Sequence, residues 1–551
     1  MIANEKYIRE DKIVIKQTKE NLGITLIALI ITIIVLLILA GVTISSLTKE
    51  NGILNKADSA KFNSEIAKYK EELNLEILNE EATNLGDRSE KINVTEGDEI
   101  KKYIPSFDKG KYEGKLIIRN DKLVYIGQGD KEEYRKAVEN DLLEDGELIN
   151  DEILEEYQPF ITEWTVEDND TIVLPLSTYR HNIYNFQVDY GDGTVVKVTS
   201  ATDENATHVY ENAGTYTVTI KGQCPGFHFS GYTKEGSNEK ITKIIQWGNV
   251  LKNEGTVVDN GIGIDFKNCI NLKGPIPEPT KNSLIKCKDL SFENCKSLDG
   301  NIPKNLFKGC SEISLKNTFW GCTSLTGEIP KELFSDCKNS TNFAGCFANC
   351  TWIKSIPDDL FANCTEITSF QSCFAGCTSI TKIPDNLFAN CPKAVDFMSC
   401  FNGCTSIIKI PNNLFKNCTK VSNFRETFSN NQNLEIIGNS IFNSEAIVYF
   451  YKIFANCSKL KNIPGDLFKN CPNSKSFNNA FWGCTSLAEI PEGLFDNCKN
   501  VEDFHATFGG STNITGNAPK LWERTNVKNS SVCFGGCSKL SNYSEIPDAW
   551  K

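Results

Sequence analysis

The chain of 551 residues is too long for one compact core, so we expect about three or four structural units. Hydrophobic residues make up 40% of the chain, enough for packed globular cores, and the formal net charge is −13. Such an acidic chain is poorly suited to nucleic acid, whose phosphates require Lys and Arg, so we exclude a nucleic-acid partner. All 22 cysteines lie from Cys224 onward, so the parts of the chain before and after this point differ in composition.

Residues 24–44 read ITLIALIITIIVLLILAGVTI and contain no charged residue. A helix of that length is long enough to cross the hydrocarbon core of a bilayer. Five basic residues precede it and should keep residues 1–23 cytoplasmic and the rest extracellular, namely Lys6, Arg9, Lys12, Lys16 and Lys19. The alternatives are a buried helix of a soluble core, which seldom has such basic flanking, and a cleaved secretory signal, whose apolar core is shorter.

The stretch from Lys19 to Gly23, followed by ITLIALIITIIVLLILAG, resembles the leader of Gram-positive type IV prepilin-like proteins. The resemblance implies cleavage after Gly23, with Ile24 as the new N-terminus. That family often has Glu at the fifth mature position, which assists filament assembly, and this chain has Ala28. Anchoring is therefore expected more than assembly into a pilus.

Beyond the apolar run, residues 53–77 place apolar side chains at helical spacing among Lys and Glu, so we expect a pilin-like helix over 24–84. Residues 85–157 predict a small α/β spacer. In it, two apolar runs flank Asn120 and Asp121, a plausible hairpin turn, and an acidic helix follows near residues 131–143.

Residues 158–223 contain short β-branched or aromatic runs separated by turn residues, the pattern of a β-sandwich. The stretches VDYGDGT and THVYENAGTYTVTIKG resemble the PKD-like immunoglobulin-type domain, with Tyr190 in place of the usual Trp. Asp189 and Asp192 could serve as calcium ligands, but acids in a Gly-rich turn are more often turn formers.

The C-terminal half is an internal repeat, marked by Leu-Phe pairs every 27 residues at 306/307, 333/334, 360/361, 387/388 and 414/415. Pairs at 441/442, 467/468 and 494/495 continue it with a single-residue slip. This period is typical of leucine-rich repeats, whose stacked turns place equivalent residues in continuous interior columns. Near the end, Leu521/Trp522 and Ala549/Trp550 replace Leu/Phe, as expected of a capping repeat.

Residues 388–391 (FANC) and 401–411 (FNGCTSIIKIP) resemble the BspA-like leucine-rich-repeat surface proteins. The resemblance extends from about residue 160 to the end, because that family often has a PKD-like domain before its repeats. It implies a connector and N-terminal cap at 224–265 and a leucine-rich-repeat solenoid at 266–551. The expected fold is thus multidomain: a transmembrane and pilin-like α-helix, a small α/β spacer, a PKD-like β-sandwich and the solenoid.

The repeat cysteines fall in two registers. Cys310, Cys337, Cys364, Cys391 and Cys418 share one, Cys322, Cys350, Cys377 and Cys404 share the other, and Asn431 and Ser511 stand where the second predicts Cys. Because polar residues can replace them, we interpret the cysteines as small buried residues forming a ladder. Disulfides at Cys346/Cys350, Cys373/Cys377 and Cys400/Cys404 are the main alternative. Structural zinc fits less well, since only four histidines exist and they are scattered.

A partner would contact positions that vary between turns. Trp320 and Trp482 occupy one such position, and the stretch IVYFYKIF adds Tyr449, Tyr451 and Lys452. Exposed aromatic rings anchor proteins and sugars alike, although these rings could instead cover neighbouring turns.

The leading hypothesis is a bacterial surface protein for adhesion or recognition, anchored in the membrane and contacting a protein or glycan on a host or neighbouring cell. The alternative is a minor pilin or pseudopilin-like subunit of a surface filament. An enzyme is the third class, and we predict none, since the repeats supply no catalytic constellation and no cofactor or metal site.

Overall fold

The structure is a computed structural model that describes residues 53–83, 91–126, 136–137, 140, 142, 157–177, 184–229, 237–250, 263–279, 283–284, 287–446 and 448–551. The expected membrane span, the cleavage site at Gly23 and Ile24, and most of the acidic helix at 131–143 lie outside these residues. No helix within the described ranges has the length and apolar character needed to cross a bilayer. The chain divides into two compact units, Met1–Glu144 and Asp145–Lys551.

In the first unit, the long helix α3 (Ile53–Thr83) buries one face. Phe62, Ile66, Tyr69 and Leu73 are spaced by three or four residues and form this face, as an amphipathic helix requires. They pack with two short helices, α4 (Gly97–Tyr103) and α5 (Lys109–Tyr112), and with the hairpin of β1 (Leu116–Arg119) and β2 (Lys122–Tyr125).

The β1-β2 hairpin turns where the sequence predicts. Asn120 and Asp121 have φ angles of 51° and 69°, the left-handed region that a two-residue hairpin loop requires at both central positions. Asn and Asp tolerate that region because their short polar side chains can bond locally. The turn prediction is therefore confirmed.

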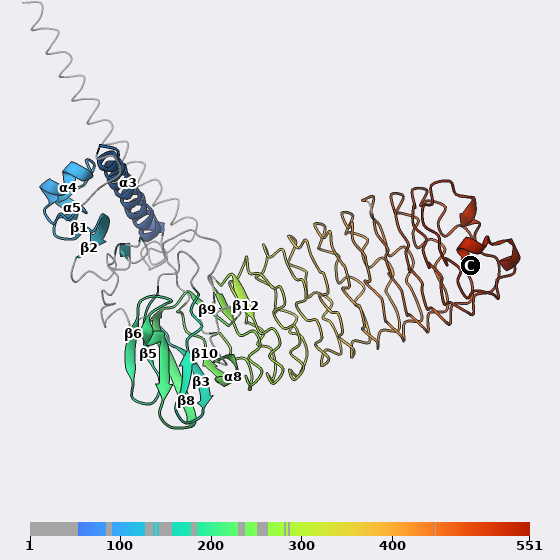
Figure 1. The fold of residues 1–551 in the computed structure, drawn as a ribbon, viewed down its shortest axis with the longest axis horizontal. Helices are drawn as coiled ribbons and strands as arrows, with labels where there is room; N and C mark the ends of the chain where they lie inside the picture. Colours follow the sequence, from blue (N-terminus) through green and yellow to red (C-terminus); the bar gives the residue numbers. More distant parts are fainter. Residues whose placement is uncertain are drawn as a thin grey trace, which may run out of the picture. The chain divides into compact units, whose positions relative to one another are not determined.

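The second unit begins with a β-sandwich (Figure 1). Five strands pair antiparallel in the order β10-β3-β8-β5-β6, and a second sheet pairs β4 with β7. Their bounds are β3 Phe160–Val166, β4 Asp170–Val173, β5 Asn185–Asp189, β6 Val195–Val198, β7 Thr207–Tyr210, β8 Gly214–Gln223 and β10 Ile241–Gln246. Strand β10 comes from the expected connector, so the sheet extends beyond residue 223.

The sandwich and the repeats share one hydrophobic core. The Trp247 indole lies between the rings of Phe160 and Phe266, with centroids 6.2 Å from each, and donates its N–H to the Pro277 carbonyl at 2.7 Å. The short helix α8 (Ser237–Lys240) precedes β10. Three short parallel strands, β9 (Gly226–His228), β11 (Gly263–Asp265) and β12 (Asp289–Ser291), then pair in the order β12-β11-β9 and begin the repeats.

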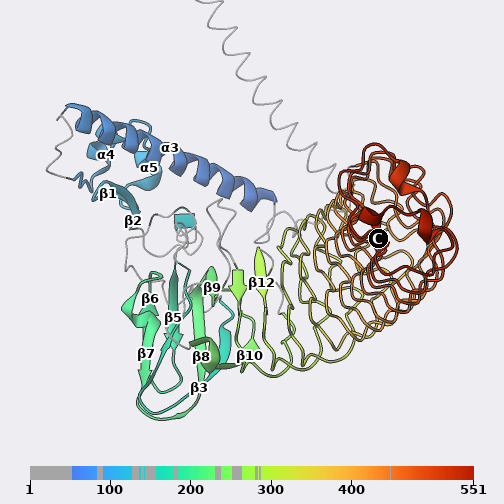
Figure 2. The same ribbon diagram turned by 45° about the vertical axis from the view of Figure 1, so that its right-hand side comes forward.

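From β11 onward the chain coils into stacked turns, drawn from yellow-green to red in Figure 1 and turned in Figure 2. We call residues 263–551 the repeat stack. Parallel bridges join equivalent residues of successive turns, Asn342 with Ser369, Ser369 with Asp396 and so on to Asn529. The spacings from Asn423 to Tyr449 and from Asp503 to Asn529 are one residue shorter than the others. Because turns add along one direction, each turn contacts mainly its two neighbours.

Phenylalanine rings fill the repeat stack in columns. One column runs through Phe319, Phe347, Phe374, Phe401 and Phe428, with ring centroids 5.5 to 5.7 Å apart and planes nearly parallel. A second runs through Phe307 and the later Leu-Phe pairs. A lone turn would leave these rings in water, so the burial that stabilises each turn comes from its neighbours.

Candidate binding surface

Apart from Cys224, which directly follows β8 of the sandwich, the cysteines lie inside the repeat stack. All 22 cysteines of the chain fall within the described residues, and each is buried and free of a disulfide. In the second register, the thiols of Cys350, Cys377 and Cys404 donate to the carbonyls of Phe319, Phe347 and Phe374, each at 3.0 Å. These three thiols thus bond the backbone of the preceding turn, which favours the buried-ladder interpretation over the disulfides at Cys346/Cys350, Cys373/Cys377 and Cys400/Cys404.

The same position explains why serine can replace cysteine. Ser511 donates its hydroxyl to the carbonyl of Phe481 at 2.8 Å, the bond that the thiols make elsewhere. Burial raises the pKa of the Cys404 thiol to about 12, so it stays protonated and keeps its donor hydrogen. A thiol held protonated is a weak nucleophile and a weak metal ligand, so this column is structural.

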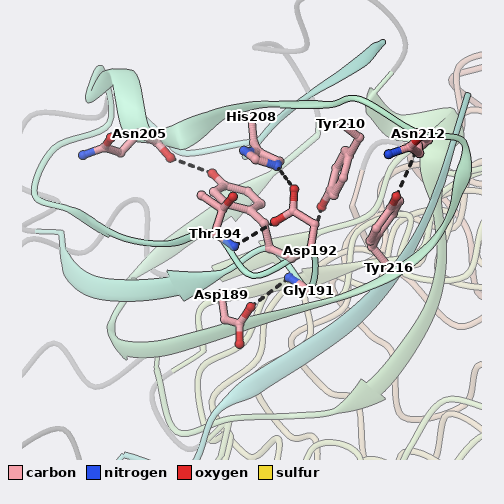
Figure 3. Close-up of polar contacts among 10 residues, drawn as sticks. Asp189, Gly191, Asp192, Thr194, Asn205, His208, Tyr210, Asn212 and Tyr216 are labelled. Carbon is pink, nitrogen blue, oxygen red and sulfur yellow. Dashed lines mark hydrogen bonds and ion pairs between the residues drawn. The ribbon is translucent and has the colours of Figure 1, made fainter. Parts of the chain in front are cut away.

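The Gly-rich loop of the sandwich uses its acids as turn formers (Figure 3). Asp189 accepts a hydrogen bond from the Gly191 N–H at 2.8 Å, and Asp192 accepts one from the Thr194 N–H at 2.9 Å. The other Asp192 oxygen lies 2.7 Å from Nε2 of His208. Burial by itself raises the pKa of Asp192. The hydrogen bonds from the Thr194 N–H and from His208 lower it by more, so the pKa of this carboxyl lies below its usual value.

The ring of His208 is held between two tyrosines. It stacks on Tyr190 with ring centroids 4.3 Å apart and meets the edge of Tyr210 at 4.6 Å. Tyr210 in turn stacks on Tyr216 (Figure 3). The Tyr190 and Tyr210 hydroxyls donate to the carbonyls of Asn205 and Tyr190. These contacts hold β7 to the loop after β5. Because the acids and the histidine are already bonded within this network, we assign them a structural role.

The structure places the five candidate contact residues in three different parts of the repeat stack. Trp320 is half-buried in an early turn, and Trp482 is 42% exposed several turns later. A Cβ on Gly509 would lie 3.1 Å from the Trp482 ring, so this indole covers the next turn, as the alternative interpretation holds. Tyr449, Tyr451 and Lys452 lie together in one turn, with Tyr449 46% exposed.

A fourth member of this group, Arg425, comes from the preceding turn. Its guanidinium carbon lies 4.9 Å from the ring centroid of Tyr451, and the Lys452 ammonium lies 5.0 Å from the same centroid. We call Arg425, Tyr449, Tyr451 and Lys452 the Tyr449 patch. Sequence reasoning missed Arg425, although it directly follows Phe424 as Tyr451 follows Phe450, so aligning the repeats could have found it.

The cations of the Tyr449 patch lack acidic partners. Across the residues that the structure describes, neither Arg425 nor Lys452 has a carboxylate within ion-pair distance. Elsewhere on the repeat stack, lysines pair with glutamates of adjacent turns, as Lys461 does with Glu435 at 2.7 Å and Lys528 with Glu502 at 2.6 Å. The patch is therefore locally positive on an acidic chain.

The backbone around Tyr449 also departs from most other turns. In eight turns an Asp, Asn or Ser side chain accepts a hydrogen bond from the N–H two residues ahead, as Asp396 does from Met398 at 2.9 Å and Asp503 from His505 at 2.9 Å. Tyr449 holds this position and has no oxygen that reaches. Among the described residues, the Tyr451 N–H has no hydrogen-bond partner.

Two segments match known protein families. Residues 161–223 match the PKD domain, which confirms the resemblance read from the sandwich sequence. Residues 368–493, which include the Tyr449 patch, match a family described as Mycoplasma protein of unknown function, DUF285. Both matches are compatible with an extracellular or surface protein.

No curated protein matches the sequence. Among solved structures, a chain of "Crystal structure of TLR13-ssRNA13 complex" is similar at 12% identity and a TM-score of 0.08. The match covers 54% of this chain and 64% of that one, so it spans less than two thirds of that chain. At this TM-score the likeness supports no argument about fold or ligand.

Proposed function

We propose that the protein is a bacterial cell-surface adhesion or recognition protein whose repeat stack is a BspA-like leucine-rich-repeat solenoid. The observation that carries this proposal is the Tyr449 patch. An exposed tyrosine ring, two cations without a carboxylate partner and an unpaired backbone N–H lie together there. In the two adjacent turns the residues equivalent to Tyr449 are small and polar, Asn423 and Ser476, and each accepts a hydrogen bond from its own backbone. Exposed aromatic and Arg side chains are favoured contact anchors, and stacked repeats present them on a rigid, extended face.

Adhesion by intact cells tests the proposal. Cells that display the full chain should adhere to host-cell or neighbouring-cell layers more than cells lacking it. The double change of Tyr449 and Tyr451 to Ala should remove much of the difference, whereas Lys409→Asn should not, since Lys409 bridges Ile436 in a different column of the same stack. Equal adhesion by cells with and without the protein would contradict the adhesive role.

We also propose that residues 24–44 anchor the chain in the membrane, with the later residues extracellular. The uncharged run and its basic flank support the anchor. Mass spectrometry of the native N-terminus in membrane and surface fractions tests how it is processed. A terminus at Ile24 indicates cleavage after Gly23, and an intact leader indicates a simple single-pass anchor.

A filament subunit is the second candidate. It is favoured by helix α3, which follows the apolar run in sequence and packs its buried face on a small hairpin domain. Ala28 in place of Glu counts against it. Co-purification of the native protein with surface filaments would support this candidate, and its absence from isolated filaments would remove it.

We propose that the activity is binding and not catalysis. The carboxylate and histidine that meet in the sandwich, Asp192 and His208, are held by a turn N–H and by ring stacking, which supports a structural role for both. Purified full-length protein should show no hydrolysis of cell-wall or host polysaccharides.

A further inference from the structure

The position of Tyr449 leaves a place for an external oxygen. In the turns of Asp396 and Asp503, a carboxylate oxygen lies 2.9 Å from the N–H two residues ahead. Tyr449 removes that oxygen and leaves the Tyr451 N–H unpaired. A ligand carboxylate that accepted a hydrogen bond from this N–H would replace the bond that a side-chain oxygen makes in those turns.

The surrounding charges suit an anion. Arg425 and Lys452 reach the Tyr451 ring from two successive turns, and no described carboxylate pairs with either. An anionic oxygen beside them would gain charge-assisted hydrogen bonds, which are about twice as strong as neutral ones. Its place resembles that of the internal Asp carboxylates, now flanked by two free cations.

The exposed ring and the paired backbone suit a sugar better than a peptide strand. The N–H groups of Tyr449, Phe450 and Lys452 donate to neighbouring turns at 3.4, 3.0 and 2.9 Å, and the Tyr451 carbonyl accepts from Glu426. A peptide could not add as a strand here, because that mode needs a row of unpaired backbone groups. The Tyr449 ring instead offers a flat face for the C–H side of a sugar ring.

We propose that the Tyr449 patch binds a carboxylate-bearing sugar of an acidic glycan, a uronic or sialic acid. This inference rests on the proposed adhesive function and names the class of ligand. The carboxylate bonds the Tyr451 N–H and lies near Arg425 and Lys452, and the sugar ring packs on Tyr449.

The test compares two acidic probes with a neutral one on the purified full-length protein. Calorimetric titration with 3′-sialyllactose or a glucuronate-containing tetrasaccharide should show saturable binding to at least one, and lactose should bind far more weakly. Added salt should weaken the binding of the acidic probe, because part of the affinity is ionic. Failure of both acidic probes to bind, or equal binding of lactose, overturns the proposal.

Three variants of Tyr449 separate the ring from the open N–H. Tyr449→Ala removes the ring and leaves the Tyr451 N–H open, whereas Tyr449→Asn removes the ring and also supplies an oxygen to that N–H. Tyr449→Asn closes the Tyr451 N–H as Asn423 closes that of Arg425, so it should bind the acidic probe about 10-fold or more weakly than Tyr449→Ala does, the worth of a hydrogen bond to a charged group. Tyr449→Phe keeps both the ring and the open N–H and should bind nearly as the parent does. If Tyr449→Asn bound the acidic probe as well as Tyr449→Ala, the open N–H would play no part and the proposal would fail.

The cation is tested separately. Lys452 has a φ of 51°, which Asn adopts readily, so Lys452→Asn removes the charge without straining the turn. It should weaken the binding of acidic probes and make that binding less dependent on salt, with Lys409→Asn as the matched control. A polyglutamate peptide that bound with the same dependence on Tyr449, while sugars did not, would replace the glycan by an acidic protein.

The outcomes distinguish this inference from the proposed function. If displayed protein promotes adhesion but binds no acidic sugar, the ligand class is wrong and the adhesive role stands. If it promotes no adhesion yet binds sialyllactose through Tyr449, the ligand inference stands and the adhesive role fails.

Discussion

Asn431 occupies a position that holds a thiol in the turns on either side. Cys404 and Cys457 donate to the carbonyls of Phe374 and Phe428. Asn431 is fully buried, and neither its amide nitrogen nor its amide oxygen has a hydrogen-bond partner among the described residues. A buried polar group without a partner destabilises the fold, so this turn is a weak point of the column.

Replacing Asn431 with Cys should therefore stabilise the protein by about 1–3 kcal/mol, the usual cost of burying an unpaired polar group. Chemical denaturation monitored by tyrosine and tryptophan fluorescence would measure the change. Asn431→Ser should shift stability in the same direction, since Ser511 already makes this bond, and Cys404→Asn should do the reverse. A destabilised Asn431→Cys would show that the amide has a role that the contacts do not account for.

Asp289 is a carboxyl in an unfavourable setting near the start of the repeat stack. Burial and the charges of Asp265 and Glu293 raise its pKa from 3.8 to about 6. A carboxyl whose pKa rises on folding binds its proton more tightly when folded, so its contribution to stability falls as pH rises from about 4 to about 6.

Asp289→Asn should stabilise the protein at pH 7 by up to about 3 kcal/mol and by little at pH 4, where the carboxyl is already protonated. The difference in melting temperature between parent and variant, measured at both pH values, isolates this group from the other carboxyls. A difference that did not change with pH would contradict the raised pKa.

At the scale of elements, the short links between turns are set by contact with the adjacent turn. Most turns contain an Ile-Pro pair, and Gly438 stands where the Pro of that pair would be. A consensus of the repeats would therefore favour Pro at position 438. The structure opposes this, because a Cβ at Gly438 would lie 2.5 Å from the Pro411 backbone. The glycine allows the close approach of two turns.

Gly438→Ala should therefore destabilise the protein by about 1–3 kcal/mol, the usual cost of overpacking. Gly465→Ala is the matched control, since a Cβ there would meet only Pro491 at an ordinary 3.8 Å. Equal melting temperatures for the two variants would show that the turns separate easily at this link.

At the scale of the whole molecule, the repeat stack has a closed C-terminal end. The last turns contain three short 3-10 helices, η2 (Leu521–Glu523), η3 (Tyr543–Glu545) and η4 (Asp548–Trp550). Trp550 is 7% exposed, its ring lies 6.5 Å from those of Phe504 and Phe534, and its carbonyl accepts the Phe534 N–H at 2.8 Å. The indole thus covers the end of two phenylalanine columns, in agreement with the capping expected there.

Trp550→Ala should loosen the end of the stack more than its middle, because stability in stacked repeats is shared mainly between neighbours. Hydrogen exchange followed by mass spectrometry should show faster exchange at residues 500–551 and little change at 340–400. Uniformly faster exchange along the stack would indicate that it unfolds as a single cooperative unit.

Much of the fold could be predicted from the sequence, because its determinants are periodic or local. The repeat of apolar residues predicts the stacked Phe columns, and Asn120 with Asp121 predicts the hairpin turn from backbone preference alone. Strand β10 was not anticipated as part of the sandwich, since pairing with β3 joins Ile241 to Trp164 across a long stretch of chain. Such pairing depends on which edge is open after folding.

The candidate site, too, could be predicted from the sequence only in part. The sequence by itself determined that Tyr449, Tyr451 and Lys452 vary from the repeat and lie close together in the chain. Only the tertiary structure decided that Arg425 reaches the Tyr451 ring, that Trp482 covers the next turn, and that the Tyr451 N–H is unpaired. The physical reason is that periodicity places residues on a turn, whereas partners between turns depend on the stacking register.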